Sequence, residues 1–379
     1  MLSSLFTRLR RALLWPMLWK EFVQMRRDRL TLAMMIGVPV LQLALFGYAI
    51  RTEVRHLPTL VLDESRTAES RALVSVMANT GNFDVVGTAG SRREVAHRIN
   101  AGSARAAIVI PPEFARDVKR GRTARAQVIV DAADPMASAA AISGASLAAA
   151  VRSQELAARA GPGRAPPLDV RVRPWYNPAL RSAAYIVPGI VGVLLSLTML
   201  LITSMAVVRE RERGTLEQLV VTPIGKTSLM LGKLLPFVLV GYVQMTNVLL
   251  FGWLLFRVPM RGSLALLYLL TLAFIVAMLG LGLLVSTVAR SQAQAMQISF
   301  FLLLPNILLS GFMFPREAMP APAQWIGMAL PLTYYLHVLR GVLLKGVGLE
   351  YLWRDALILT GFATALVAVS VRKFAKTIE

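Results

Sequence analysis

Long apolar runs separated by short polar segments dominate this chain. Six runs are close to or longer than the ~20 residues that a helix needs to cross the hydrocarbon core of a bilayer. They lie at residues 30–50, 184–208, 231–256, 264–288, 294–314 and 355–371. Each run is predicted to be a helix, because a segment in lipid must satisfy its own backbone hydrogen bonds. The pattern therefore predicts an α-helical integral membrane protein with six transmembrane helices.

A different pattern fills residues 51–183, between the first two runs. Short apolar stretches typical of strands alternate here with helical stretches. The predicted strands are 59–63, 83–86, 106–110, 126–130 and 170–175, and the predicted helices are 66–79, 91–100, 111–120 and 135–160. Glycines and prolines at 161–167 predict a linker. Strands that alternate with helices indicate a large α/β domain between transmembrane helices 1 and 2.

Two further segments flank the predicted spans. Leucines and aromatic residues recur at helical spacing in residues 2–28, with arginines opposite and a break at Pro16, which predicts amphipathic elbow helices on the inner membrane surface. A plain basic tail that fixes topology is the alternative. Between the fifth and sixth runs, Pro331 and Gly341 interrupt an apolar stretch at 324–344. This stretch predicts short re-entrant or interfacial helices between helices 5 and 6, and a seventh crossing is the alternative.

Lysine and arginine are concentrated in one set of short segments, namely the N-terminal segment, the loops after the second and fourth runs, and the tail. Short cytoplasmic loops are the ones enriched in these residues, so both termini are predicted to be cytoplasmic. The N-terminus lacks the layout of a signal peptide, and the first run is expected to remain in the mature protein. The predicted domains are the cytoplasmic elbow 1–29, transmembrane helix 1 at 30–50, the extracytoplasmic α/β domain 51–183, and a core of helices 2–6 at 184–379.

Composition narrows the function classes. The chain has 379 residues, of which 56% are hydrophobic, and a formal net charge of +20. This charge does not indicate nucleic-acid binding, because 19 of the 41 Lys and Arg residues are dispersed among acidic residues in 51–183, without aromatic residues that could stack on bases. The absence of cysteine excludes disulfides, thiolate metal sites and cysteine nucleophiles.

Candidate chemistry is sparse within the spans. The interiors of the six predicted helices contain no Asp, Glu, Lys, Arg or His, so they lack groups that could hold and release a coupling ion. Residues 225–227 match the end of a phosphate-binding loop, but Val220 stands where that motif requires its first glycine. The three histidines belong to no hydrolase or metalloprotease motif. No catalytic, cofactor or metal site is therefore predicted, and the energy for any pumping must come from another chain.

The most polar stretch beside the predicted bilayer is RERERGTLEQLVVTP at 209–223, directly after the second span. Its alternating Glu and Arg side chains can pair with the charges of a partner. Gly214 permits a sharp bend before a new helix that starts at Thr215. We interpret this stretch as a docking surface for a partner on the cytoplasmic side. A solvated loop that only sets topology is the alternative.

Two stretches carry a resemblance to a known family. VVRERERGTLEQLVVTP at 207–223 and LLSGFMFPREAMP at 308–320 are similar to hallmark stretches of ABC-2 type exporter permeases, and the order of elements resembles that family over essentially the whole chain. The large inserted domain is similar to the multidrug-type branch. The resemblance implies an exporter permease subunit in the inner (plasma) membrane, together with a cytoplasmic ABC ATPase that binds ATP and Mg and a second permease in a homo- or heterodimer. The substrate does not carry over from the family. Our hypothesis is that an amphiphilic, drug-like or lipid-like substrate is exported and that the extracytoplasmic domain gates the exit or binds a periplasmic adaptor.

The candidate site residues come from the same two stretches. The segment after the second span would contact the ATPase through Arg209, Glu210, Arg211, Glu212, Arg213, Gly214, Thr215, Glu217, Thr222 and Pro223. The candidate outer gate in the re-entrant region comprises Gly311, Phe312, Phe314, Pro315, Glu317 and His337. Glu317 and His337 can line an outer vestibule or form an interfacial pair.

Two other function classes stay open at this stage. An ABC-type membrane subunit can transmit force to an extracytoplasmic partner without moving a substrate. A membrane-embedded enzyme for lipid-linked substrates would need clustered Asp, Glu and His near the outer surface. Only Glu317, His337 and Glu350 come near that requirement in the sequence.

Overall fold

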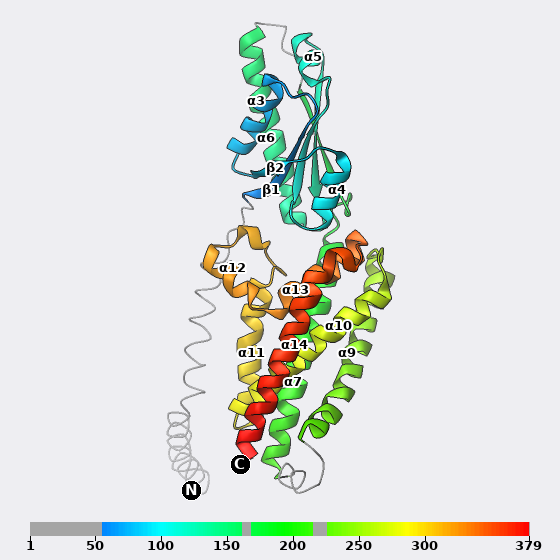
Figure 1. Cartoon of the computed structure of the whole chain (residues 1–379), viewed down its shortest axis with the longest axis vertical. Helices are drawn as coiled ribbons and strands as arrows, with labels where there is room; N and C mark the ends of the chain where they lie inside the picture. Colours follow the sequence, from blue (N-terminus) through cyan, green and yellow to red (C-terminus); the bar gives the residue numbers. More distant parts are fainter. Residues whose placement is uncertain (1–54, 161–167, 215–225, 379) are drawn as a thin grey trace, which may run out of the picture.

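The computed structural model describes residues 55–160, 168–214 and 226–378. The predicted elbow helices, the first predicted span, the linker at 161–167 and the end of the charged stretch lie outside these residues. Figure 1 shows an elongated molecule in which an α/β domain stands at one end of a bundle of long helices. We call this the domain end of the bundle.

In the described part of the chain, five strands and four helices form the α/β domain. Its elements are β1 (Leu57–Asp63), α3 (Ala68–Asn79), β2 (Phe83–Thr88), α4 (Arg92–Asn100), β3 (Ala106–Ile110), α5 (Phe114–Lys119), β4 (Ala124–Asp131), α6 (Pro135–Ala160) and β5 (Leu168–Trp175). The sheet has the order β2-β1-β3-β4-β5, in which β3 and β4 are antiparallel and the other neighbours are parallel. Every predicted strand position carries a strand, whereas α5 begins later than predicted. The side of the membrane on which this domain lies stays a prediction.

Helices cover both faces of the sheet (Figure 1). On one face, α3 and α6 pack against the strands, with Leu73 in the same apolar cluster as Ile108. On the other face, α4 contributes Val95 to a cluster that includes Val109. Burial on both faces explains why β3 is an uninterrupted apolar run rather than an alternating one.

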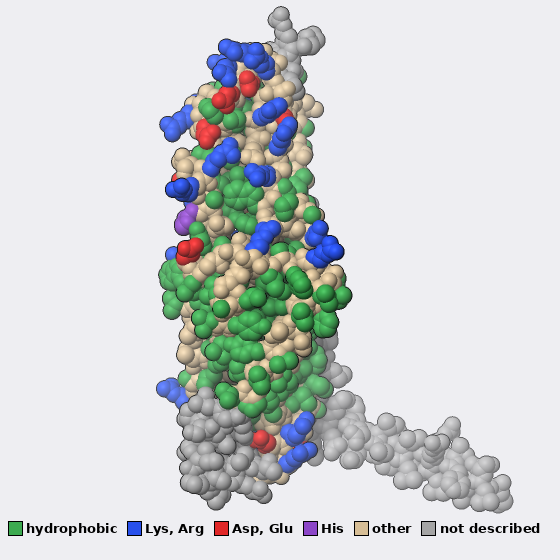
Figure 2. Space-filling view, turned by 90° about the vertical axis from the view of Figure 1, so that its right-hand side faces the viewer, with side chains coloured by type: hydrophobic (Ala, Val, Ile, Leu, Met, Phe, Trp, Pro, Cys, Tyr) green, Lys and Arg blue, Asp and Glu red, His purple; other side chains and the backbone are tan. Residues whose placement is uncertain are grey.

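Among the described residues, five helices are long and apolar enough to cross a membrane. They are α7 (Ser182–Glu212), α9 (Lys226–Phe256), α10 (Leu264–Val288), α11 (Gln292–Leu309) and α14 (Leu349–Ile378). Each corresponds to one of the predicted spans two to six, which confirms a mostly helical, multi-pass membrane protein. Figure 2 shows hydrophobic side chains gathered over the bundle, while most Lys, Arg, Asp and Glu side chains on that face lie above or below it. Such a belt is expected of a surface that lies in lipid.

Helix α7 lies inside the bundle, in contact with α9, α10, α11 and the shorter helix α13 (Pro331–Arg340). Its Leu195 and Met199 are fully buried. A small residue allows α10 to approach closely, because a Cβ on Gly282 would lie 2.8 Å from the Cβ of Thr203 in α7. Close approach at small residues is typical of helix packing in membranes, where dispersion contacts replace the hydrophobic effect.

Two short helices lie between α11 and α14. They are α12 (Ala321–Met328) and α13, which is extended by a π-helical turn η2 (Gly341–Lys345) and bent by 84° against α12. By length and composition this pair also fits one broken span. However, α11 ends and α14 begins at the domain end of the bundle (Figure 1). At that end η2 also accepts hydrogen bonds from the backbone N–H groups of Arg261 and Gly262 in the α9–α10 loop.

Candidate functional site

The last turn of α7 carries the first part of the predicted docking stretch. Helix α7 ends with residues 209–212, Arg213 caps it, and Gly214 adopts the left-handed conformation with φ of +68°. The N–H of Gly214 donates to the carbonyl of Arg211 (3.2 Å). Glycine has no Cβ and tolerates this conformation, so Gly214 ends the helix. We call residues 209–214 the charged turn.

The charged turn holds the connection between α10 and α11. Glu212 Oε1 accepts from the backbone N–H of Gln292 (3.0 Å), and Oε2 accepts from the side-chain amide of Gln292 (2.5 Å). Arg209 Nε donates to Gln292 Oε1 (3.1 Å), and Arg211 donates to the carbonyl of Ala289. Since Gln292 is the first residue of α11, the Glu212 carboxylate also lies at the positive end of that helix dipole. These contacts join α7 to the start of α11.

The sequence assigned Glu212 to a partner, whereas the structure places its carboxylate on Gln292 of the same chain. Arg209, Glu212 and Arg213 are nevertheless exposed, so a partner can reach the charged turn. The remaining predicted contact residues, Thr215, Glu217, Thr222 and Pro223, lie outside the described part of the chain.

Sequence reasoning used the α10–α11 connection only for topology and did not assign it to the site. A signal for it exists, because Ser291 and Gln294 match the S-x-x-Q pattern that begins many helices. In the structure Ser291 Oγ accepts a hydrogen bond from the backbone N–H of Gln294 (3.2 Å), and Gln294 Oε1 accepts from the N–H of Arg290 (2.9 Å). The start of α11 is therefore fixed by its own cap as well as by Glu212.

At the domain end, the candidate gate residues connect α11 to α7. Gly311 has a φ of +88°, and its carbonyl accepts from Tyr185 Oη in the first turn of α7 (3.2 Å) and from Arg340 Nη1 of α13 (3.1 Å). The ring of Phe312 lies against Gly189 of α7, where a Cβ would come within 2.3 Å of the ring. Helices α7 and α11 are thus joined at both ends.

The other candidate gate residues lie close by. Phe314 packs on a small apolar cluster with Leu309 and Met319. Pro315 precedes a short 3₁₀ helix, η1 (Arg316–Ala318), and lines a pocket with Arg316. The side chain of Glu317 lies outside what the structure describes.

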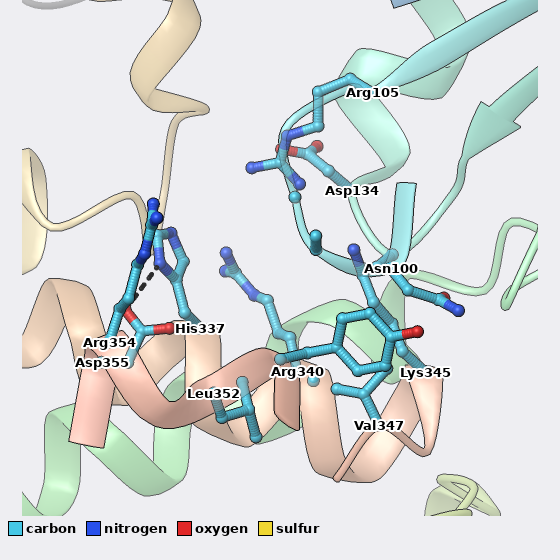
Figure 3. A pocket seen from close by; sticks show the side chains of 15 residues that line it. Asn100, Arg105, Asp134, His337, Arg340, Lys345, Val347, Leu352, Arg354 and Asp355 are labelled. Atoms are coloured by element: carbon cyan, nitrogen blue, oxygen red, sulfur yellow. Dashed lines mark ion pairs between the residues drawn. The ribbon is translucent and has the colours of Figure 1, made fainter. Parts of the chain in front are cut away.

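His337 pairs with a residue that the sequence did not single out. Its Nδ1 lies 3.5 Å from Oδ1 of Asp355 in α14, as the dashed line in Figure 3 marks. Both residues line the space between the α/β domain and the bundle. His337 therefore has Asp355 as a described partner, and the expected pair of His337 with Glu317 stays a prediction.

A polar pocket fills the junction between the α/β domain and the bundle (Figure 3). It has a volume of about 240 Å³ and is lined by residues of the α4–β3 loop, the segment before α6, α13, η2 and α14. A second pocket of about 210 Å³ shares Arg105, Asp134, His337 and Arg340 with it and extends to the loop after α11. We call the two together the interdomain pocket.

Two residues that line this pocket, Lys345 and Arg105, pair with a buried acid. Asp131, at the end of β4, has no exposed surface and accepts from Lys345 Nζ (2.6 Å), Arg105 Nη1 (3.1 Å) and the N–H of Ala133 (3.1 Å). Burial raises the pKa of Asp131, but the opposite charges of Lys345 and Arg105 outweigh it and hold the pKa below the ordinary 3.8. Lys345 also donates to the carbonyl of Ile99 in α4 (3.3 Å). The α/β domain and η2 therefore share one buried charge network.

These two regions present charged side chains. Among the described residues, no group of His, Asp and Glu side chains is placed to hold a metal ion. The charged turn offers exposed charges at one end of α7, and the interdomain pocket offers charged side chains at the other.

Comparisons with known proteins match most of the chain. A family model described as "ABC-2 family transporter protein" matches residues 29–372. "Probable multidrug ABC transporter permease YbhS" of Escherichia coli (strain K12) is 33% identical over 329 residues, which cover 86% of this chain and 87% of that protein. "Probable multidrug ABC transporter permease YbhR" of the same organism is 30% identical over 342 residues, which cover 90% of this chain and 92% of that protein. "Inner membrane transport permease YhhJ", also from that organism, is 33% identical over 287 residues, 74% of this chain and 75% of that protein.

Proposed function

Because the chain belongs to the ABC-2 family of transporter proteins, we propose that it is the membrane-spanning permease subunit of an exporter in the inner membrane. A separate cytoplasmic ABC ATPase binds ATP and Mg and supplies the work. The permease moves an amphiphilic substrate, drug-like or lipid-like, toward the outside. A second permease, either another copy or a related chain, completes the transporter. YbhS and YbhR are named as probable multidrug permeases, which supports the multidrug class.

The observation that carries this proposal is the double connection between α7 and α11. Glu212 and Arg211 hold the start of α11 at one end, and Tyr185 holds the loop after α11 at the other. Helix α7 has 31 residues, which corresponds to a length of about 45 Å. A displacement of the charged turn is therefore transmitted along α7 and α11 together to the interdomain pocket.

In this mechanism the ATPase contacts the exposed face of the charged turn and the segment from Thr215 to Pro223. Closure of the ATPase dimer favours one position of the charged turn over another. A partner can shift a conformational equilibrium only if it binds the two states with different affinity, and this contact supplies the difference. The shift moves α7 relative to α10 and opens the path outward. Helices α12 and α13 act as re-entrant helices at the exit. The loop after α11, with Gly311, Phe312, Phe314 and Pro315, moves to open the exit.

The proposal fixes the orientation. Both termini and the charged turn are cytoplasmic, while the α/β domain is extracytoplasmic and can gate the exit or bind a periplasmic adaptor. Five described helices and the first predicted span satisfy this arrangement if α12 and α13 do not cross. The alternative function, force transmission to an extracytoplasmic partner without a transported substrate, uses the same contacts.

Reconstitution with the partner ATPase tests the proposal. We expect Glu212→Lys combined with Glu217→Lys to lower dye accumulation in inside-out vesicles and ATPase stimulation on the order of tenfold, because in this proposal both residues belong to the surface that contacts the ATPase. Membrane insertion should be unchanged. The matched control reverses two acids of the α/β domain, Asp84→Lys with Glu113→Lys, both of which are exposed.

Three outcomes separate the possibilities. Full export by the Glu212/Glu217 variant would rule out the docking role. ATPase activity that no amphiphile stimulates, with no accumulation in vesicles, would favour the force-transmitting alternative. Replacing residues 57–174 with a short linker shows whether the α/β domain serves transport or only assembly.

A further inference from the structure

The interdomain pocket gathers basic side chains from both parts of the molecule. The basic residues that line it are Arg105 of the α/β domain, Arg316 of η1, Arg340 of α13, Lys345 of η2 and Arg354 of α14. Figure 3 shows Arg105 on the upper wall of the pocket. The guanidinium of Arg340 extends from α13 toward the centre of the pocket. A concentration of guanidinium groups in a concave space is typical of a site for an anion.

The acidic side chains at the pocket are already engaged. Asp355 faces His337 at 3.5 Å. Asp134 Oδ1 accepts the backbone N–H groups of Met136 (2.9 Å) and Ala137 (3.3 Å) at the start of α6. Asp131 lies beneath Lys345 and Arg105. The carboxylates therefore leave Arg316 and Arg340 without an acidic partner among the described ion pairs.

Two of these arginines have donors that the protein does not use. Arg340 donates through Nη1 to Gly311 and stacks on the ring of Tyr185, 4.0 Å from its centroid, but its Nε and Nη2 are buried without a hydrogen-bond partner in the described part of the chain. Arg316 donates through Nη2 to the carbonyl of Gln324 (3.4 Å), and its Nε is also buried without a partner. Buried donors that lack an acceptor are unfavourable, so a rotation that turned these guanidinium groups toward an oxyanion in the pocket would be favourable.

The pocket has room for a phosphate group. Its two volumes are about 240 and 210 Å³. Helix α12 contributes Gln324 to the pocket and exposes apolar side chains, among them Trp325 and Ile326. Exposed tryptophan is typical of a membrane–water interface.

We infer that the interdomain pocket binds a phosphate group, held by the guanidinium groups of Arg340 and Arg316. The phosphate belongs either to an anionic lipid headgroup that enters beside α12 or to a small soluble phosphate. Binding would tie η1, α13 and the α/β domain together, because these parts all line the pocket. The site is a property of this chain alone and does not depend on the ATPase or on the direction of transport.

The test uses the full-length chain purified in a detergent without phosphate. In one arm, inorganic phosphate is titrated and thermal unfolding is followed by tryptophan fluorescence. In the other arm, phosphatidylglycerol is added and bound lipid is counted by native mass spectrometry, with diacylglycerol as the lipid that lacks phosphate. The variants are Arg340→Gln and Arg316→Gln, and the control is Arg257→Gln, an exposed arginine that does not line the interdomain pocket.

In the wild type and in Arg257→Gln, we expect saturable thermal stabilisation by inorganic phosphate or saturable binding of phosphatidylglycerol. Each pocket variant should lose at least tenfold in affinity for the same ligand. If Arg340→Gln does not fold, Arg316→Gln carries the test, because its side chain makes no contact with Tyr185 among the described ring contacts. A response to phosphatidylglycerol alone identifies the headgroup as the source, and a response to inorganic phosphate identifies the soluble ion. Absence of binding in the wild type, or equal binding in the pocket variants, would overturn the inference.

Discussion

Charged groups join elements of the chain at both ends of the bundle, but in opposite environments. At the charged turn, Arg209, Glu212 and Gln292 meet on an exposed surface. At the domain end, the Asp131–Lys345 pair is buried and Tyr185 is almost covered. Exposed ion contacts contribute little and are screened by salt, whereas breaking a buried pair leaves an uncompensated charge. One end is therefore suited to exchanging partners and the other to holding its geometry.

The contrast between exposed contacts at the charged turn and buried contacts at the domain end agrees with the proposal that force enters at the charged turn and is transmitted to the domain end. A docking site must form and release contacts with each cycle, so weak, exposed contacts are an advantage there. In the proposed mechanism, the domain end transmits a displacement of the helices to the α/β domain while its contacts stay intact. Contacts that are buried and that join different elements suit this role. Lys345 shows this clearly, because its ammonium reaches both β4 and α4 from η2.

The largest expected effect comes from breaking the buried pair. We expect Asp131→Asn to destabilise the protein by about 3–5 kcal/mol, because it leaves Lys345 buried without its counter-charge. Thermal unfolding of the purified chain, followed by tryptophan fluorescence, measures the loss. Asp131→Asn combined with Lys345→Met should recover most of it.

Asp169→Asn is the matched control for this prediction. Asp169 is also an acid on a strand of the sheet and pairs with Arg171 at 2.8 Å, but both side chains are partly exposed. It should change the unfolding temperature little. Equal effects of the two single substitutions would show that burial does not distinguish the domain end.

A smaller effect is expected where Phe312 packs on α7. Gly189→Ala places a methyl group 2.3 Å from the ring of Phe312, which should cost about 1–3 kcal/mol through overpacking. Adding Phe312→Leu should relieve part of that cost. Gly361→Ala in α14 is the control, since a Cβ there meets nothing within 4 Å. Unfolding temperatures that fall equally for both glycines would contradict the assigned contact.

Much of the architecture was predictable because it rests on repeated patterns. The stretch 106–110 is apolar at every position and forms the buried strand β3, and Ser91 caps α4 as its position predicts. The spans follow from length and composition in the same way. No comparable pattern marks the pairs that join the elements. Asp131 and Lys345 lie 214 positions apart, and Glu212 and Gln292 lie 80 apart, so their pairing depends on the tertiary arrangement.

At the charged turn we expect a smaller effect on stability than at Gly189. Glu212→Ala and Gln292→Ala, alone and combined, should lower the unfolding temperature slightly and non-additively, because each removes the same exposed contact. The loss of stability in Glu212→Ala should shrink as salt is raised, because part of it is the Coulombic attraction of Glu212 to Arg211 and Arg209. ATPase-driven dye accumulation should fall far more than stability does. A large loss of stability that is independent of salt would place this contact in the same class as the buried pair.

The smallest effect is expected from pH. An acid whose pKa is lowered in the folded state contributes stability above its unfolded pKa and loses it as the pH falls through the folded value. The pKa of Asp131 lies below 3.8 in the folded protein, because Lys345 and Arg105 outweigh the effect of burial. The gap in unfolding temperature between the wild type and Asp131→Asn should therefore stay constant from about pH 8 to about pH 5 and narrow only at more acidic pH. If this gap closed already near neutral pH, Asp131 would not be held as a carboxylate. The domain end would then lack the stable buried charge pair that distinguishes it from the charged turn.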